Sequence, residues 1–253
     1  MICRDQAVVL NTRDFRETSK IAIFYCRKYG KVSGLLKGIR ANPRKFASNL
    51  DFLSLNEVIF YKKRFSELHL VSECDLKRSF NSLRSNLVKF NIGSFCSEFI
   101  NSIMAPEDAH PEIFDLLLNF LDSLESTSLT QKLVYNFVLK GLSLSGFQPH
   151  LESCVSCKSL IQKQAFFSNK LGGLLCNRCL VKDRLSEPIL GGTIATIVFF
   201  QNKDWQDSLR LNILPKVEEE LSKIIFSFLS FNLERKFKTL EYLQESFKER
   251  ATS

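Results

Sequence analysis

The sequence lacks an apolar run long enough to span a membrane as a helix. Its densest apolar segment, Ile113 to Leu124, is interrupted by Asp115, Asn119 and Asp122. The first residues also lack the basic region, the longer apolar region and the small-residue cleavage site of a secretory signal. We therefore expect a cytoplasmic protein without a membrane partner. Global disorder is excluded as well, because 45% of the residues are hydrophobic and 25% are charged.

The motifs of several large enzyme classes are also missing. The sequence contains no G-x-x-x-x-G-K-[ST] phosphate loop, no G-x-G-x-x-G dinucleotide loop, no G-x-S-x-G nucleophile elbow and no H-E-x-x-H metal helix. The whole chain holds only three histidines, and they are far apart in the sequence. Catalysis is therefore unsupported, and we expect a protein that is not an enzyme.

One pattern keeps a zinc-dependent nucleic-acid enzyme open as an alternative. Zinc deaminases carry H-x-E followed downstream by P-C-x-x-C, and this chain has His110-Pro111-Glu112 ahead of Cys154. However, Ser153 rather than proline precedes Cys154, and a second cysteine pair would be left without a role. A solvated start of a helix is the favoured interpretation of these three residues.

Acidic residues are scarce in one region of the chain. Residues 1–50 hold 11 Lys and Arg against 3 Asp and Glu, whereas residues 51–253 hold 24 against 24, so the net charge of +8 arises in the first 50 residues. From Lys28 to Leu50 there is no acidic residue at all. A basic segment attached to a neutral body is typical of a protein that binds a polyanion.

Short strands are predicted for about the first 75 residues. Five segments rich in β-branched, aromatic or aliphatic side chains alternate with polar or turn-forming stretches. They are Ala7–Thr12, Lys20–Arg27, Val32–Gly38, Ser54–Tyr61 and Leu68–Cys74. Five such strands predict a small closed barrel. We favour the five-stranded OB-fold because it closes its edges and offers a face that binds nucleic acid, although an SH3-like barrel fits the strand count nearly as well.

Beyond Ser79 the apolar period becomes helical, and residues 150–185 then interrupt it. Helices are predicted at Phe80–Ile103 with a possible break at Gly93, at Pro111–Leu124, from Ser128 to Gly146, at Thr193–Phe200, from Pro215 onward and at Phe237–Phe247. The expected fold class is therefore α+β. An N-terminal OB-fold barrel occupies residues 1–79, and a mostly helical domain occupies residues 80–253 with a four-cysteine module inserted at about 150–185.

Four cysteines form two closely spaced pairs inside this insert. Cys154-Val-Ser-Cys157 is followed by 18 residues and then by Cys176-Asn-Arg-Cys179. Two intervening residues let both thiolates of a pair point at one ion, and the interval between the pairs is typical of four-cysteine zinc sites. We predict a structural Zn²⁺ ion, because four cysteine ligands leave no position for a reacting water. A redox C-x-x-C is disfavoured because no βαβ pattern surrounds either pair. The other cysteines, Cys3, Cys26, Cys74 and Cys96, are scattered and are expected in the core.

The basic residues of the N-terminal segment are candidates for binding a nucleic-acid backbone. Strand tips and loops of a small barrel converge, so these charges could line a groove for phosphates. The candidate DNA-binding residues are Arg13, Lys20, Arg27, Lys28, Lys31, Lys37, Arg40, Arg44 and Lys45. Aromatic side chains lie among them and would stack on bases, although each one singly is better explained as barrel core. These aromatic residues are Phe15, Phe24, Tyr25, Tyr29 and Phe46.

Several segments, taken in order, resemble one protein family. The chain has Ala-Val-Val-Leu-Asn-Thr-Arg-Asp-Phe-Arg-Glu at 7–17, Ile-Ala-Ile-Phe-Tyr-Cys-Arg-Lys-Tyr-Gly-Lys-Val at 21–32 and Leu-Leu-Lys-Gly-Ile-Arg at 35–40. Leu-Ser-Gly-Phe-Gln-Pro at 144–149 leads into the first cysteine pair, and Gly-Gly-Leu-Leu at 172–175 precedes the second. Lys-Thr-Leu-Glu-Tyr-Leu follows at 238–243. Over nearly the whole chain this pattern is similar to the RecO family of bacterial recombinational repair proteins.

The resemblance implies an OB-fold, a helical domain and a zinc module. It also implies binding of single- and double-stranded DNA and annealing of complementary strands. The family acts with RecR and with single-stranded-DNA-binding protein, whose acidic C-terminal tail would dock on the helical domain, to load the RecA recombinase. The zinc cysteines are not universal in the family, which favours a structural role. The basic residues that match the family's N-terminal block are Arg13, Lys20, Arg27, Lys31, Lys37 and Arg40.

A second alternative function is a general OB-fold and zinc-ribbon module. Such a module would bind nucleic acid but would not anneal it. Annealing of protein-coated strands separates this alternative from the function that the resemblance implies.

Overall fold

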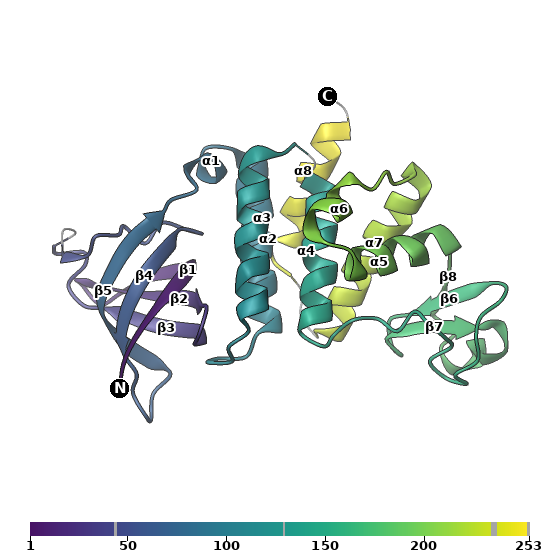
Figure 1. Ribbon diagram of the computed structural model, residues 1–253, viewed down its shortest axis with the longest axis horizontal. Coiled ribbons are helices and arrows are strands. Elements are labelled where there is room, and N and C mark those ends of the chain that lie inside the picture. Colours follow the sequence, from purple (N-terminus) through teal and green to yellow (C-terminus); the bar gives the residue numbers. More distant parts are fainter. Residues whose placement is uncertain (43–44, 129, 234–236, 252–253) are drawn as a thin grey trace. The chain divides into compact units, whose positions relative to one another are not determined.

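The computed structural model describes residues 1–42, 45–128, 130–233 and 237–251. Packing divides the chain into two units (Figure 1). Unit 1 combines residues 1–128 with 239–253, and unit 2 comprises residues 129–238. Within the described ranges, none of the helices combines the length and the apolar character needed to cross a membrane.

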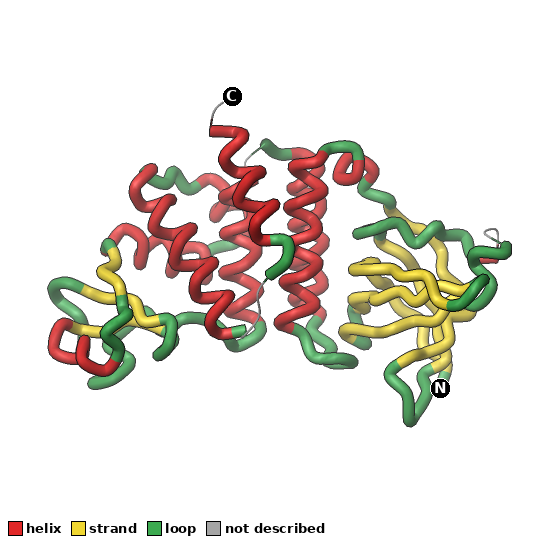
Figure 2. Tube along the Cα trace, turned by 180° about the vertical axis from the view of Figure 1, so that it is seen from behind, coloured by secondary structure: helices red, strands yellow, loops and turns green. Residues whose placement is uncertain are grey.

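Five strands of unit 1 form a closed barrel, drawn in yellow in Figure 2. They are β1 (Ile2–Phe15), β2 (Ser19–Cys26), β3 (Gly30–Leu36), β4 (Leu55–Tyr61) and β5 (Leu68–Arg78). Their order around the barrel is β1-β2-β3-β5-β4, and every neighbouring pair is antiparallel except β3 with β5. Closure with five strands confirms the predicted OB-fold.

Strand β1 is much longer than the sequence pattern predicted. Its first half pairs with β4 and its second half with β2, so one strand closes the barrel on both sides. Residues 2–6 alternate regularly between exposed and buried, but the buried Asp5 and the polar neighbours hide this alternation in the sequence. The ladder with β2 shifts between Val9 and Asn11, which leaves an extra residue, Leu10.

Small and aromatic side chains together fill the barrel. Alternate residues of β2 point inward, and of these Phe24 is 1% exposed. A Cβ atom on Gly34 would lie 2.6 Å from Val71 and 2.9 Å from the Phe24 ring, so glycine makes room for that ring.

The four scattered cysteines are buried, as predicted. Burial raises the pKa of the Cys26 and Cys96 thiols, and it raises that of Cys74 to about 12, so these thiols stay neutral.

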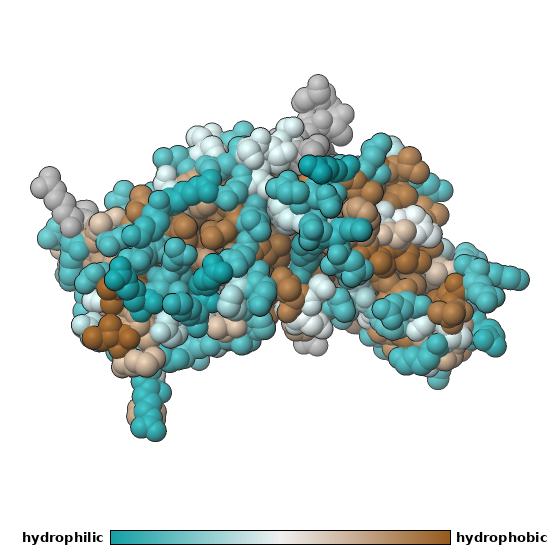
Figure 3. Space-filling model, in the orientation of Figure 1, coloured by the Kyte–Doolittle hydropathy of each residue, from teal (hydrophilic) through white to brown (hydrophobic). Residues whose placement is uncertain are grey.

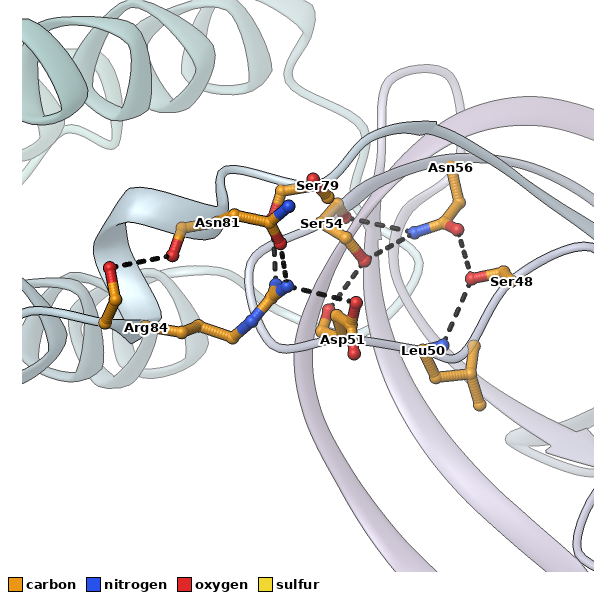
Figure 4. A network of polar contacts seen from close by, with 9 residues as sticks. Ser48, Leu50, Asp51, Ser54, Asn56, Ser79, Asn81 and Arg84 are labelled. Carbon is orange, nitrogen blue, oxygen red and sulfur yellow. Dashed lines mark hydrogen bonds and ion pairs between the residues drawn. The ribbon is translucent and has the colours of Figure 1, made fainter.

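A buried polar network fixes the long connection between β3 and β4 (Figure 4). The Asn56 side chain is fully buried, accepts a hydrogen bond from Ser48 Oγ at 2.5 Å and donates to Ser54 Oγ at 2.9 Å. Asp51, in the same connection, forms an ion pair of 3.1 Å with Arg84. Because buried polar atoms are costly to leave unpaired, this network holds the connection in one conformation against the barrel.

Among the described residues, four α-helices complete unit 1. They are α1 (Asn81–Arg84), α2 (Leu87–Ile103), α3 (Pro111–Ser126) and α8 (Leu240–Ala251). The Ser97 hydroxyl of α2 donates a hydrogen bond of 2.7 Å to the carbonyl of Leu10, the extra residue in β1. This bond gives a partner to a backbone carbonyl at the irregular part of the ladder. Helix α8 is joined to α2 at its start, where Glu98 accepts hydrogen bonds from the backbone N–H and the hydroxyl of Thr239.

The helical stretch after the barrel breaks at a different place from the one considered in the sequence. The break lies at Ser85 and Asn86, and Asn86 caps α2 by accepting a hydrogen bond from the Lys89 N–H. Gly93 lies inside α2 instead. A Cβ atom there would come within 2.6 Å of Leu53, so this glycine lets the helix approach the β3–β4 connection closely.

The described residues of unit 2 form four α-helices, a 3-10 helix and a small sheet. The helices are α4 (Thr130–Leu144), α5 (Gly191–Asn202), α6 (Trp205–Arg210) and α7 (Pro215–Asn232). Between α4 and α5 lie β6 (Ala165–Ser168), β7 (Gly173–Cys176), the 3-10 helix η2 (Asn177–Lys182) and β8 (Glu187–Ile189), with sheet order β7-β6-β8. The insertion of the cysteine module into a helical segment is therefore confirmed. The short α6 was not predicted.

The barrel strands end at Arg78, next to the boundary expected at residue 79. Packing nevertheless groups α1, α2, α3 and α8 with the barrel.

Candidate functional site

The four paired cysteines converge at one point of unit 2. All four sulfur atoms lie within 4.8 Å of one another, and the Sγ atoms of Cys157 and Cys176 are 3.7 Å apart. A tetrahedral zinc ion with Zn–S bonds of about 2.3 Å would set its sulfur ligands about 3.8 Å apart. The cluster therefore has the dimensions of a single tetrahedral metal site.

The first cysteine pair is held in a tight turn. The Lys158 N–H donates to the Cys154 carbonyl at 2.8 Å, and the Cys154 N–H donates to the Ser159 carbonyl at 3.0 Å. Lys158 adopts a left-handed conformation with φ of 61°, which costs a residue with a side chain about 1–2 kcal/mol. The turn folds back so that both thiols of the pair face the same point.

The second pair is positioned by the end of a hairpin. Cys176 is the last residue of β7, and Cys179 lies in η2 directly after it. Gly173 at the start of β7 lies against the backbone of His150, where a Cβ atom would be 2.3 Å from the His150 carbonyl oxygen. The Leu174 N–H donates to that same oxygen at 3.0 Å. The segment before the first cysteine pair thus packs directly against β7, and this contact brings the two cysteine pairs together.

Hydrogen bonds to sulfur favour the thiolate form of Cys154 and Cys157. The side chain and the backbone of Ser159 lower the pKa of Cys157 to about 6. Burial acts to raise the pKa of Cys154, but backbone N–H groups, including that of Cys157, outweigh it and the pKa is lowered. Ser156 acts to lower the pKa of Cys179, whereas burial and the neighbouring sulfurs raise it to about 11. A divalent cation that displaces the remaining thiol protons would leave four thiolate ligands.

Cysteine sulfur atoms supply all four ligands of this candidate metal site. Among the residues that the structure describes, these four cysteines are the one group of His, Cys, Asp and Glu side chains arranged to hold a metal. His150, the histidine nearest in sequence, places Nε2 2.8 Å from Ser153 Oγ. Four thiolates suit a soft, tetrahedral ion and leave no open coordination position, so the cluster can cross-link two chain segments but offers no site for a bound water.

The H-x-E pattern is not part of this cluster. His110 and Glu112 belong to unit 1, whereas the four cysteines belong to unit 2. His110 Nε2 lies 3.2 Å from an Asp108 carboxylate oxygen, and Glu112 is in the first turn of α3. Both residues are therefore placed as parts of an ordinary helix start.

Five of the predicted DNA-binding residues gather at one end of the barrel. This basic end comprises Arg13, Lys20, Lys37, Arg40 and Lys45, which lie beside the β1–β2 turn and in the connection after β3. The Arg40 N–H donates to the Thr18 carbonyl at 2.9 Å, and the Lys45 ammonium donates to the Lys37 carbonyl at 2.7 Å. A cleft of about 330 Å³ is lined in part by Lys20 and Arg40, and also by Asp14, whose carboxylate forms an ion pair of 3.5 Å with Arg40. The basic end therefore presents several cations around one hollow.

Three other candidates lie at the opposite end of β2 and β3. Arg27 forms an ion pair of 2.8 Å with Asp115 of α3, and its guanidinium lies 5.8 Å from the Phe114 ring centre. The Lys31 ammonium donates to the Asn101 carbonyl of α2 at 2.7 Å. Lys28 is exposed. At about 3.3 Å per residue, Arg27 is roughly 23 Å along β2 from Lys20, so the candidates do not form one surface. Arg44 lies outside the described residues.

The aromatic residues among these cations belong mostly to the core. Phe24, Tyr25 and Phe46 are each at most 4% exposed. Tyr29 packs edge-on against Phe60 with ring centres 5.5 Å apart. Of the five aromatic residues considered, Phe15 alone lies at the basic end without being buried.

One basic surface was not predicted from the sequence. The β4–β5 loop, residues 62–67, reads Lys-Lys-Arg-Phe-Ser-Glu, and five of its six residues are exposed. The signal was present as three consecutive cations before an aromatic residue. It was hidden because the chain beyond residue 50 is neutral when counted as a whole.

The comparisons with known proteins cover nearly the whole chain. Residues 1–80 match the family described as Recombination protein O N terminal, and residues 84–241 match Recombination protein O C terminal. A protein of Alkaliphilus metalliredigens named DNA repair protein RecO is 26% identical over 243 residues, which cover 95% of this chain and 98% of that relative. Proteins of the same name from Thermoanaerobacter sp. and Desulfatibacillum aliphaticivorans are also 26% identical, over 96% and 94% of this chain and over 97% and 95% of the respective relative.

Proposed function

Because this chain belongs to the RecO family of DNA repair proteins, we propose that it binds single- and double-stranded DNA and anneals complementary strands. It would thereby help to load the RecA recombinase onto DNA coated with single-stranded-DNA-binding protein. The observation that carries this proposal is the basic end of the barrel, where Lys20 and Arg40 line a cleft beside the exposed Arg13, Lys37 and Lys45.

Annealing by this surface needs no chemical step. Each lysine or arginine that contacts a phosphate releases condensed counterions, which favours binding at low salt. When two backbones are neutralised on one protein, their mutual repulsion falls and the local concentration of complementary strands rises until bases pair. In this account the protein is a non-catalytic mediator.

The four cysteines fit a zinc ion in a structural role. Cys154 and Cys157 would hold it from the first turn, and Cys176 and Cys179 from the end of β7 and from η2. When bound, the ion supplies a cross-link between these two segments, which the chain arranges through the contact of Gly173 with His150. The DNA-binding surface proposed above lies on unit 1 and does not include these ligands.

The partners proposed for this chain follow from its family. They are RecR and single-stranded-DNA-binding protein, whose C-terminal tail would dock on the helical part, with the RecA filament as an indirect partner. A general OB-fold and zinc-ribbon module without annealing activity is the outcome that would limit the proposal.

The proposal is tested by the annealing rate of naked complementary oligonucleotides, followed by fluorescence quenching. The protein should accelerate annealing, and the double variant Lys37→Ala with Arg40→Ala should slow it several-fold, because phosphate contacts are lost. A matched control removes two exposed cations of unit 2, Lys203→Ala with Lys216→Ala, and should anneal like the parent. Binding without any acceleration would reduce the protein to a simple binding module.

A further inference from the structure

The β4–β5 loop exposes a large aromatic ring. Phe65 is 92% exposed, whereas the phenylalanines of the barrel core are at most 4% exposed. Two exposed cations, Lys63 and Arg64, directly precede it, and the Arg64 guanidinium lies 5.5 Å from the Phe65 ring centre. A single exposed apolar side chain is common, but a ring beside cations at a loop tip has the composition of a stacking platform for nucleic-acid bases.

The base of this loop is anchored, so its tip is presented in a defined position. His69, which is fully buried, accepts a hydrogen bond from the Lys63 N–H at Nδ1, at 3.2 Å. Its Nε2 therefore carries the proton and donates to Glu107 at 2.7 Å. Glu107 also forms an ion pair of 2.5 Å with Lys62. The first cation of the loop is thus neutralised within the protein, and Lys63 and Arg64 remain for a ligand.

A hollow adjoins the platform. It has a volume of about 600 Å³ and is lined by the loop together with Met1 and Glu107. The Met1 backbone pairs with Lys62 in both directions, since the Lys62 N–H donates to the Met1 carbonyl at 2.9 Å and the terminal ammonium donates back at 3.4 Å. In Figure 3 a hydrophilic projection extends downward at the place where Figure 1 draws the β4–β5 loop.

This loop is separate from the basic end of the barrel. Leu68, the first residue of β5, lies beside Ser33 in the parallel ladder, so residues 62–67 precede it toward the Gly30 end of β3. Lys37 and Arg40 follow the other end of that strand. The two cationic surfaces therefore stand at opposite ends of β3.

We propose that the β4–β5 loop is a second DNA site, specific for single strands. A base stacks on the Phe65 ring while Lys63 and Arg64 contact the neighbouring phosphates. The proposal rests on the DNA annealing proposed above and deepens it. One strand is held by the basic end and the other by the loop, so two unpaired strands occupy one barrel before they pair.

The test compares the affinities of Phe65 variants for single-stranded and duplex oligonucleotides. Loss of one base stack in Phe65→Ala should weaken single-strand binding about 5- to 150-fold. Duplex affinity should stay unchanged, since paired bases cannot stack on the ring. Phe65→Trp is the matched control, and it should retain single-strand affinity and show tryptophan quenching on binding that the parent, with Trp205 alone, does not show.

The salt dependence separates the ring from the charges. Phe65→Ala should keep the slope of log affinity against log salt, whereas Lys63→Ala with Arg64→Ala should reduce it by about 1.4 for a single strand. The inference is overturned if Phe65→Ala binds single strands like the parent while Lys37→Ala with Arg40→Ala does not. That result would leave the proposed annealing function intact. Failure of the parent to bind any DNA would instead remove the proposed function itself.

Discussion

The sulfur atoms of Cys157 and Cys176 lie 3.7 Å apart, although 18 residues separate the two cysteines in the chain. The cysteine module around them, which extends to β8, contains little regular structure that could hold it closed without a metal. Its sheet has strands of four, four and three residues, and its 3-10 helix has no buried residue. Sheets this small are marginal in water. We therefore expect metal ligation to supply much of the stability of the cysteine module.

The first prediction concerns metal content. The purified protein should contain about one zinc ion per chain, and Cys176→Ser should lose it and unfold at a lower temperature, because binding free energy of a structural site is folding free energy. Cys96→Ala is the control, since that buried cysteine lies in α2 and should leave the metal content unchanged. Elemental analysis of both variants checks the prediction. Full zinc occupancy in Cys176→Ser would refute the four-cysteine site.

The second prediction separates two neighbouring glycines. Gly173→Ala places a Cβ atom 2.3 Å from the His150 carbonyl oxygen, so the two cysteine pairs should move apart and zinc affinity should fall. A Cβ atom in Gly172→Ala would lie more than 4 Å from any atom outside the neighbouring residues. The only cost of this substitution is the left-handed φ of 71°, which destabilises alanine by about 1–2 kcal/mol. Competition with a chelator measures both affinities. Equal losses in the two variants would show that the contact with His150 does not align the site.

The third prediction concerns Arg27, which the sequence places among the DNA-binding residues. Because its guanidinium pairs with Asp115 and lies over Phe114, Arg27→Ala should lower the free energy of unfolding by about 0.5–1 kcal/mol. DNA affinity should change no more than in Lys28→Ala, an exposed neighbour. Denaturant unfolding and DNA titration of both variants test this. A large loss of DNA affinity with unchanged stability would contradict this prediction and show that Arg27 contributes to DNA binding.

The fourth prediction is a pH dependence of stability. Hydrogen bonding to Lys62, and to a lesser extent to His69, lowers the pKa of Glu107 below its ordinary value of 4.5. Because the folded pKa is the lower one, the ionised carboxylate stabilises the fold. This contribution is present in full above pH 4.5 and is lost as the pH falls through the lowered folded pKa.

Glu107→Gln removes this titration. The variant should be less stable than the parent at pH 6, and the difference should shrink as the pH falls below 4.5. Thermal unfolding across this range measures the difference. A constant gap between the two proteins at every pH would contradict the assignment.

The sequence predicted features that depend on local patterns. Five runs of β-forming residues predicted the barrel, and the spacing of the cysteines predicted their convergence, because both signals are contained in a few neighbouring residues. The partners of Arg27 and Lys31 could not be predicted. They lie in α3 and α2, 88 and 70 residues further along the chain, and no local pattern reports such a contact.

Phe65 is a further residue that the sequence did not single out. It lies between two predicted strands, and its exposure became evident only when the structure placed it in an anchored loop.

A role as a mediator is tested most directly by the annealing rate of complementary oligonucleotides that are precoated with single-stranded-DNA-binding protein. This protein should accelerate pairing of the coated strands, and Lys37→Ala with Arg40→Ala should lose most of the acceleration. Intact binding to naked DNA without any acceleration of the coated strands would contradict a role as a mediator.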